Sequence, residues 1–321
     1  MRRPALWALM VVVIALLPMA TSEPATASHV PASRITRSYY VASSSSDKAV
    51  LLGCYQADKT GRLTLFFGAP TQVGTAYGAT LWGAPNLTAA QVGNLAKDFI
   101  RGYTWCRASS SYRLLIGLGT SNGTMDSRST AWLRNHGKAW ATMVNQVAAW
   151  ANRYYPGSAQ VYAAWDAEPS WSTYDKAHQW MYGYDVLYPA RRALYANFSA
   201  DGCPTTTATN GPCNNGWNQR AVWHLAWEHD PSLTIPQIYA TSGVNAKQWQ
   251  LIDEWATHNT GDGIFFYGVM SQYGACRQSG GCAGTNNTPH RAWNFLIWYL
   301  RSHAHTYQSA LDTMTDMNWA T

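Results

Sequence analysis

Residues 159–171 read AQVYAAWDAEPSW, a short apolar run that ends in two carboxylates, Asp166 and Glu168, and is closed by Pro169. Alternate side chains of a β-strand point to opposite faces. The two faces of this strand would carry Tyr162, Ala164, Asp166 and Glu168 on one side, and Val161, Ala163 and Trp165 on the other. The two acids would then lie about 6.6 Å apart along one face, close enough to feel each other's charge. The alternative is that one acid pairs with an arginine or caps the helix that follows.

On both sides of this strand, short apolar runs alternate with amphipathic stretches. We expect strands at residues 62–70, 112–120, 192–200, 232–240 and 263–270, and helices at residues 87–103, 130–154, 173–186, 216–230, 245–259 and 288–303. Residues 48–56 are the candidate for one more strand. This alternation predicts parallel strands with helices outside. We expect an α/β fold, a single (β/α)8 TIM-barrel-like domain, and the alternative is a doubly wound open parallel sheet.

The first 46 residues are set apart by composition. Arg2 and Arg3 precede an apolar segment, and the small residues Ala25-Thr26-Ala27 follow it, a pattern typical of a signal peptide over residues 1–27. Residues 28–46, which end in a run of serines, are expected to be a flexible lead-in. We expect residues 47–321 to form one domain that is secreted, monomeric and without a membrane span.

The cysteines of a chain expected to be exported predict disulfides better than metal ligands. Two pairs bracket short polar loops, and the third pair follows by elimination. The expected bridges are Cys203–Cys213, Cys276–Cys282 and Cys54–Cys106. Zinc is the alternative, but no Cys-x-x-Cys or His-x-x-x-His spacing supports it. We therefore expect no metal and no cofactor.

Composition narrows the class of ligand. The formal net charge of +6 is spread along the chain without a basic run, so we expect no nucleic-acid partner. The chain has 17 Trp and 19 Tyr against 7 Phe. Trp and Tyr combine a flat apolar face with a polar edge, which is the surface on which sugar rings stack. The tryptophans placed in loops or beside the carboxylates, and so the candidates for a cleft, are Trp82, Trp105, Trp165 and Trp171.

Uncharged polar and aromatic side chains follow the other expected strands. Functional groups of a barrel lie at the carboxyl ends of its strands. Those ends offer Asn122, Asn197, Gln237, Tyr239 and Tyr267, or Gln272 and Tyr273 just past the strand that contains Tyr267. Such a lining suits a neutral polyhydroxylated ligand. The chain contains no Gly-x-Ser-x-Gly motif and no Gly-rich phosphate loop, which argues against a serine hydrolase and a nucleotide site.

Three of these motifs resemble secreted (β/α)-barrel glycoside hydrolases that have an Asp-x-Glu strand, the family 18 chitinases and the family 25 lysozyme-type muramidases. Residues 113–123, RLLIGLGTSNG, resemble the chitinase strand before the acid-bearing one, and residues 161–168 resemble the Asp-x-Glu strand. Residues 236–241, PQIYAT, are similar to a late muramidase strand with Gln and Tyr. The longer chitinase series of acids is represented only by its end, and the first-strand acid of the muramidases has no counterpart in residues 63–70.

The resemblance implies a glycosidase that acts on a polysaccharide, such as the amino-sugar polymers peptidoglycan or chitin. Glu168 would be the general acid, kept protonated by an ionised Asp166, which would hold a 2-acetamido group or stabilise the oxocarbenium-like charge. The expected substrate-binding residues are Tyr239, Gln237, Asn197, Tyr267, Trp165, Trp171 and Asn122. A second carboxylate facing Glu168 would come from a loop, with Asp126 and Asp201 as candidates. The alternatives are a non-catalytic glycan- or cell-wall-binding barrel and an export-pathway structural protein.

Overall fold

The computed structural model describes residues 34–320 except residues 84, 188–189, 191 and 231. The strands of its large sheet are β1 (Ile35–Val41), β2 (Arg62–Phe66), β6 (Leu114–Ser121), β7 (Ala159–Asp166), β8 (Leu194–Ala196), β9 (Ser232–Thr234), β10 (Gly268–Ser271) and β11 (Thr313–Ala320). The helices are α1 (Ser46–Cys54), α2 (Ala89–Cys106), α3 (Thr130–Tyr154), α4 (Tyr174–Asp185), α5 (Gln219–Trp223), α6 (Val244–Thr260), α7 (Tyr273–Gln278) and α8 (Pro289–Arg301). A π-helical turn, His224–Glu228, continues α5.

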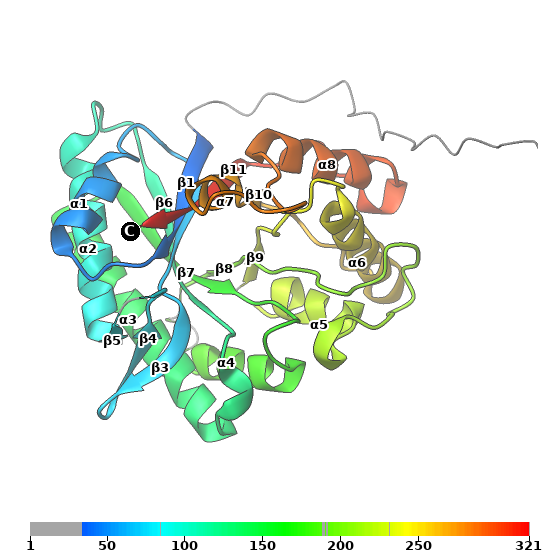
Figure 1. Ribbon diagram of the computed structural model, residues 1–321, viewed down its shortest axis with the longest axis horizontal. Helices are drawn as coiled ribbons and strands as arrows, with labels where there is room; N and C mark the ends of the chain where they lie inside the picture. The colour runs from blue at the N-terminus through cyan, green and yellow to red at the C-terminus, as the bar shows by residue number, and fades with distance from the viewer. Residues whose placement is uncertain (1–33, 84, 188–189, 191, 231, 321) are drawn as a thin grey trace, which may run out of the picture.

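The large sheet forms a nearly closed barrel. Its eight strands are all parallel, in the order β10-β11-β1-β2-β6-β7-β8-β9. Two parallel bridges, Thr234 with Phe266 and Gln237 with Met270, connect the segment around β9 to the segment around β10, at the two ends of this order. Helices surround the strands (Figure 1). The predicted α/β barrel is therefore confirmed, and the open sheet is excluded.

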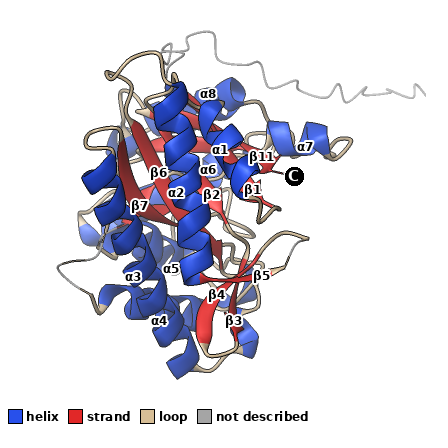
Figure 2. Ribbon diagram, turned by 90° about the vertical axis from the view of Figure 1, so that its left-hand side faces the viewer, coloured by secondary structure: helices blue, strands red, loops and turns tan. Residues whose placement is uncertain are grey.

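A small antiparallel sheet interrupts the alternation of strands and helices between β2 and α2. It consists of β3 (Ala69–Val73), β4 (Ala76–Thr80) and β5 (Asn86–Thr88), and it lies beside the barrel strands (Figure 2). The predicted strand at residues 62–70 thus comprises β2 and the start of β3. The chain then enters α2 through a capping box, in which Thr88 and Gln91 satisfy each other's backbone N–H groups.

Side chains of β7 alternate between the two layers of the fold as predicted. Val161, Ala163 and Trp165 pack in the core between strands and helices, whereas Ala164 packs inside the barrel against Tyr195 and Phe66. On β6, two glycines make room for these interior rings. A Cβ at Gly117 would lie 2.7 Å from the Tyr195 ring, and one at Gly119 would lie 2.4 Å from the Phe66 ring.

Three expectations about elements are corrected. Residues 28–46 are not all a flexible lead-in, because β1 lies within them and pairs with β11 and β2. Residues 48–56 are not a strand, because they belong mainly to α1, which Ser45 caps. The strand expected at residues 263–270 begins only at Gly268. The two barrel strands that the sequence analysis did not predict are β1 and β11.

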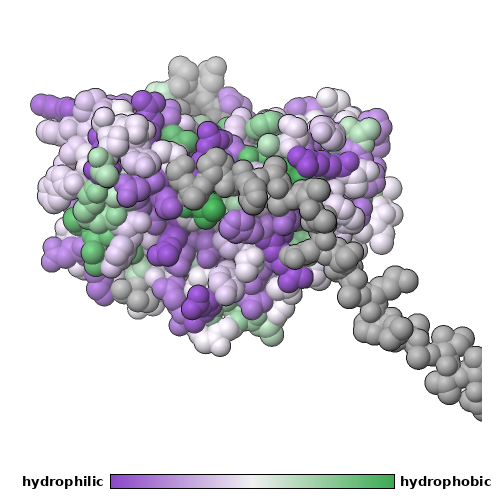
Figure 3. Space-filling model, turned by 90° about the horizontal axis from the view of Figure 1, so that it is seen from above, coloured by the Kyte–Doolittle hydropathy of each residue, from purple (hydrophilic) through white to green (hydrophobic). Residues whose placement is uncertain are grey.

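Three disulfides join Cys54 to Cys106, Cys203 to Cys213, and Cys276 to Cys282, as predicted. Such bridges fit an extracellular protein. The expected signal peptide, residues 1–27, lies outside the described residues. Among the described helices, none has the length and apolar character needed to cross a bilayer. The face seen in Figure 3 is largely hydrophilic, and its hydrophobic side chains form separate small patches.

Candidate active site

Asp166 ends β7 inside the barrel and is fully buried. Its Oδ1 accepts a hydrogen bond of 2.5 Å from Gln237 Nε2, whereas its Oδ2 is buried without a hydrogen-bond partner. Burial raises the pKa of Asp166 to about 7, the bond from Gln237 opposes this rise, and the charge of Asp201 adds to it. A carboxyl group in this position takes up and releases a proton near neutral pH.

Glu168 follows two residues later, and Asn122 holds its backbone. The Glu168 N–H donates to Asn122 Oδ1 at 3.0 Å, and Asn122 Nδ2 donates to the Glu168 carbonyl at 2.9 Å and to Ser172 Oγ at 2.8 Å. Burial raises the pKa of the Glu168 carboxyl well above its ordinary value, and the charges of Asp166 and Asp201 raise it further. The surroundings of the Glu168 carboxyl therefore favour its protonated form, and Asn122 fixes the backbone that carries it.

A line of hydrogen-bonded polar side chains crosses the barrel beneath the two acids. Ser38 Oγ and Thr315 Oγ1 lie 2.8 Å apart, and Ser38 Oγ accepts from the Thr64 N–H. Thr64 Oγ1 donates to Asn197 Oδ1 at 3.2 Å. Asn197 also accepts, through its carbonyl, from Gln237 Nε2 at 3.0 Å. We call these five residues the polar belt; it connects the opposite walls of the barrel to the carboxylate of Asp166.

Aromatic rings surround the carboxyl end of the barrel. The centroid of Trp82 lies 5.2 Å from Tyr40, 6.1 Å from Trp319 and 6.2 Å from Trp171. Tyr239 lies close to Tyr40, and burial together with Asp166 and Glu168 raises the pKa of both tyrosines well above the ordinary value. Their hydroxyls thus stay protonated. We call these five residues the aromatic rim.

Several buried polar atoms at this end of the barrel have no hydrogen-bond partner in the described structure. Besides Asp166 Oδ2, they are Ser199 Oγ and Trp82 Nε1. Each such atom costs about 1–3 kcal/mol when it is left unpaired. Their gathering around two acids is typical of a site that binds a ligand with many hydroxyl or amide groups.

The structure brings Asp166, Glu168, Asn122, Asn197, Gln237, Tyr239 and Trp171 together and separates the other two predicted residues from them. Trp165 is fully buried outside the barrel, with its ring 4.7 Å from Trp180, because it alternates with Asp166 along β7. Tyr267 precedes β10 and lies over Arg62 at the amino end of the barrel. The expectation that these two residues contact a ligand beside the acids is therefore corrected.

The other tryptophans and the loop acids proposed from the sequence also divide into residues near the two acids and residues away from them. Trp82 belongs to the aromatic rim, whereas Trp105 is two-thirds exposed on the outside of α2. Of the two loop acids, Asp126 accepts from the Thr173 N–H and hydroxyl at the start of α4, so it has a capping role. Asp201 instead lies close enough to Asp166 and Glu168 to raise the pKa of both.

Sequence reasoning missed Tyr40 and Trp319, because they lie on β1 and β11, the two strands that it did not assign. The two strands pair with each other across most of the described chain, and this pairing is visible only in the structure. Within the described residues, no three His, Cys, Asp or Glu side chains are arranged to hold a metal ion. The chain matches no protein-family model and no curated protein.

Proposed function

We propose that the protein is a secreted glycoside hydrolase that cleaves a polysaccharide by general acid catalysis. The observation that carries the proposal is Glu168, a carboxyl group at the carboxyl end of β7 whose pKa is raised well above its ordinary value by burial and by Asp166. A glycosidic oxygen is a poor leaving group unless it is protonated as the bond breaks. An acid that keeps its proton at neutral pH supplies that proton.

The surroundings of Glu168 support a sugar as the substrate. The aromatic rim offers Trp82, Trp171 and Trp319 for stacking on sugar rings. Ser199 offers an unpaired hydroxyl, and Asp166 offers an unpaired carboxylate oxygen. In this proposal Gln237 holds Asp166, and Asp166 in turn accepts a hydrogen bond from a 2-acetamido N–H. An amino-sugar polymer such as peptidoglycan or chitin is therefore the first substrate class to test.

The test is release of reducing ends from peptidoglycan, chitin oligomers, galactosaminoglycans and plant glucans by the mature protein and by Glu168→Gln. We expect the wild type to cut at least one polymer, and kcat to fall by about 10²–10⁴-fold in Glu168→Gln because the proton donor is lost. Glu228→Gln is the matched control, since Glu228 lies on the π-helical turn outside the barrel. It should retain wild-type kcat.

Two results would contradict the proposal. If the wild type binds a glycan without cutting any polymer of the panel, the protein is a non-catalytic glycan-binding barrel. If Glu168→Gln retains wild-type turnover, the enzyme uses a different acid.

A further inference from the structure

We infer that Asp201 is the second reacting carboxylate of this site, the base that activates the attacking water while Glu168 acts as the acid. The inference deepens the proposed function and rests on it. It assigns to Asp166 a binding and positioning role in place of a reacting one.

The chain after β8 keeps its ladder with β7 and leads directly to Asp201. The printed register pairs Trp165 with Ala196. Beyond it, the Asn197 N–H donates to the Trp165 carbonyl at 2.9 Å, and the Ser199 N–H donates to the Ala167 carbonyl at 3.2 Å. This register puts Ser199 level with Glu168. Asp201 follows two residues later, in the turn closed by the hydrogen bond from the Cys203 N–H to the Ala200 carbonyl, where its charge reaches both Asp166 and Glu168.

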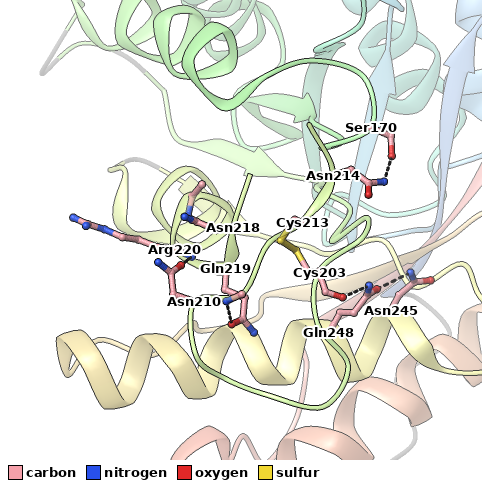
Figure 4. The surroundings of a disulfide bond; sticks show 12 residues. Ser170, Cys203, Asn210, Cys213, Asn214, Asn218, Gln219, Arg220, Asn245 and Gln248 are labelled. Carbon is pink, nitrogen blue, oxygen red and sulfur yellow. Dashed lines mark hydrogen bonds between the residues drawn. A yellow bond between two sulfur atoms is a disulfide. The ribbon is translucent and has the colours of Figure 1, made fainter. Parts of the chain in front are cut away.

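Asp201 is fixed in this position by the loop that the Cys203–Cys213 disulfide closes. Its carbonyl accepts from the Asn214 N–H at 3.0 Å. Figure 4 shows the next link, in which Asn214 Nδ2 donates to Ser170 Oγ at 2.8 Å. Ser170 lies two residues after Glu168, so Asn214 ties the two acid-bearing segments together. Gly202 permits this approach, because it has a φ of +70° and a Cβ there would lie 2.0 Å from Asn214 Oδ1.

Exposure separates the roles of Asp166 and Asp201. Asp166 is fully buried, one of its oxygens is bound to Gln237, and its pKa of about 7 keeps it partly protonated at neutral pH. Asp201 is half-buried, so it can reach both water and a bound sugar. Its negative charge is felt by both other acids, as the raised pKa values of Asp166 and Glu168 show. The mouth of the barrel thus holds Glu168, whose pKa is raised, and the half-buried Asp201 on the segments that follow two neighbouring strands.

The offset of the two acids leaves room for a water between them. Glu168 and Asp201 follow the neighbouring strands β7 and β8, and Asp201 lies two residues beyond the level of Glu168. Carboxyl groups about 6.5–9.5 Å apart with a water between them are typical of inverting glycosidases, and groups about 5 Å apart of retaining ones; we assign the inverting course to this pair. In the inverting step, the C1–O glycosidic bond breaks, its electron pair stays on the leaving oxygen, and that oxygen takes the Glu168 proton. The water oxygen bonds to C1 and gives its proton to Asp201, after which solvent returns both acids to their starting states.

The experiment compares the wild type, Asp201→Asn and Asp175→Asn on a polymer that the wild type cuts, with thermal unfolding measured for each. Asp175 is an exposed acid in the first turn of α4, so Asp175→Asn removes the same charge away from the barrel mouth. We expect kcat of Asp201→Asn to fall about 10²–10⁴-fold with a smaller change in KM. The Asp175→Asn variant should match the wild type in kcat and KM. Proton NMR of the wild-type reaction should show the inverted anomer first.

Each other outcome has a separate meaning. A wild type that cuts no polymer refutes the proposed function, and the inference falls with it. A wild type that cuts, beside an Asp201→Asn variant with unchanged kcat, refutes the inference alone, as does a retained first anomer. If Asp201→Asn fails to fold, Asp201→Glu keeps the charge and moves it by one methylene. We expect Asp201→Glu to fold and to have reduced kcat; wild-type kcat in this variant would overturn the inference.

Discussion

The burial of the Asp166 carboxyl lowers the free energy of unfolding by an amount that depends on pH. Its pKa is about 7 in the folded protein against an ordinary value of 3.8. Between these two values the folded state keeps a proton that the unfolded state has released, so the free energy of unfolding falls as pH rises. The cost is absent below about pH 4 and complete above about pH 7. Because one pKa unit corresponds to about 1.4 kcal/mol, the full cost is on the order of 4 kcal/mol.

We therefore expect Asp166→Asn to be more stable than the wild type at pH 8 and to lose this advantage at pH 4, because asparagine has no proton to release. Urea unfolding at a series of pH values measures the difference. Asp175→Asn serves as the control, since Asp175 is exposed and should leave the pH dependence unchanged. A pH dependence in Asp166→Asn equal to that of the wild type would show that Asp166 is ionised without cost.

At this scale, the sequence predicted the acids and their nearest partners well. The two-residue period of a strand was enough to bring Asp166 and Glu168 to one face, and the carboxyl ends of later strands supplied Gln237 and Tyr239. The same period places Trp165 on the opposite face of the strand from Asp166, which argued against a contact between Trp165 and a ligand beside the acids. Tyr267 could not be placed, because the apolar run at residues 263–270 hides the point where β10 begins.

At the scale of elements, the polar belt explains why β1 and β11 escaped detection. Their interior positions include Ser38 and Thr315, which bond to each other across the two strands. A strand whose interior face is hydroxyl-rich lacks the continuous apolar run by which buried parallel strands are recognised. The strand expected at residues 48–56, which belong mainly to α1, was a related error. A short apolar run there is compatible both with a strand and with the buried face of a helix.

The three disulfides should differ in their effect on stability. In the chain-entropy account, the loop of 52 residues closed by Cys54–Cys106 is worth about 4 kcal/mol, and the loop of 6 closed by Cys276–Cys282 about 2 kcal/mol. Replacing both cysteines of a pair by alanine should therefore lower the urea midpoint most for Cys54–Cys106. The Cys276–Cys282 double variant serves as the comparison. The opposite ranking would mean that local packing, and not loop closure, sets the contribution of each bridge.

At the scale of the whole molecule, the barrel depends on the pairing of β1 with β11. Their parallel register runs from Ile35 opposite Met314 to Val41 opposite Ala320. Both strands also pair on their other side, β1 with β2 and β11 with β10. Neither strand is an edge, so a lost backbone hydrogen bond in either one weakens the interior of the sheet.

We expect Thr315→Pro to destabilise the protein by about 3 kcal/mol or more, because proline removes a ladder N–H and clashes within a central strand. Thr315→Val is the matched control, since it removes only the hydroxyl of the polar belt and should cost about 1 kcal/mol. Thermal unfolding followed by circular dichroism measures both. Equal losses in the two variants would assign the effect to the hydroxyl, and the pairing of β1 with β11 would then contribute little.

The pairing of β1 with β11 also sets an order of events in time. Each disulfide joins cysteines at most 52 residues apart, whereas Ile35 and Met314 meet across most of the described chain. Contacts between distant segments form late, since a long loop must close, at a cost in chain entropy, before such contacts can stabilise the chain. The three bridges can therefore be oxidised while the barrel is still open. During that interval the inner faces of β1 and β11 meet the solvent, and they carry the hydroxyls of Ser38 and Thr315 beside the rings of Tyr40 and Trp319.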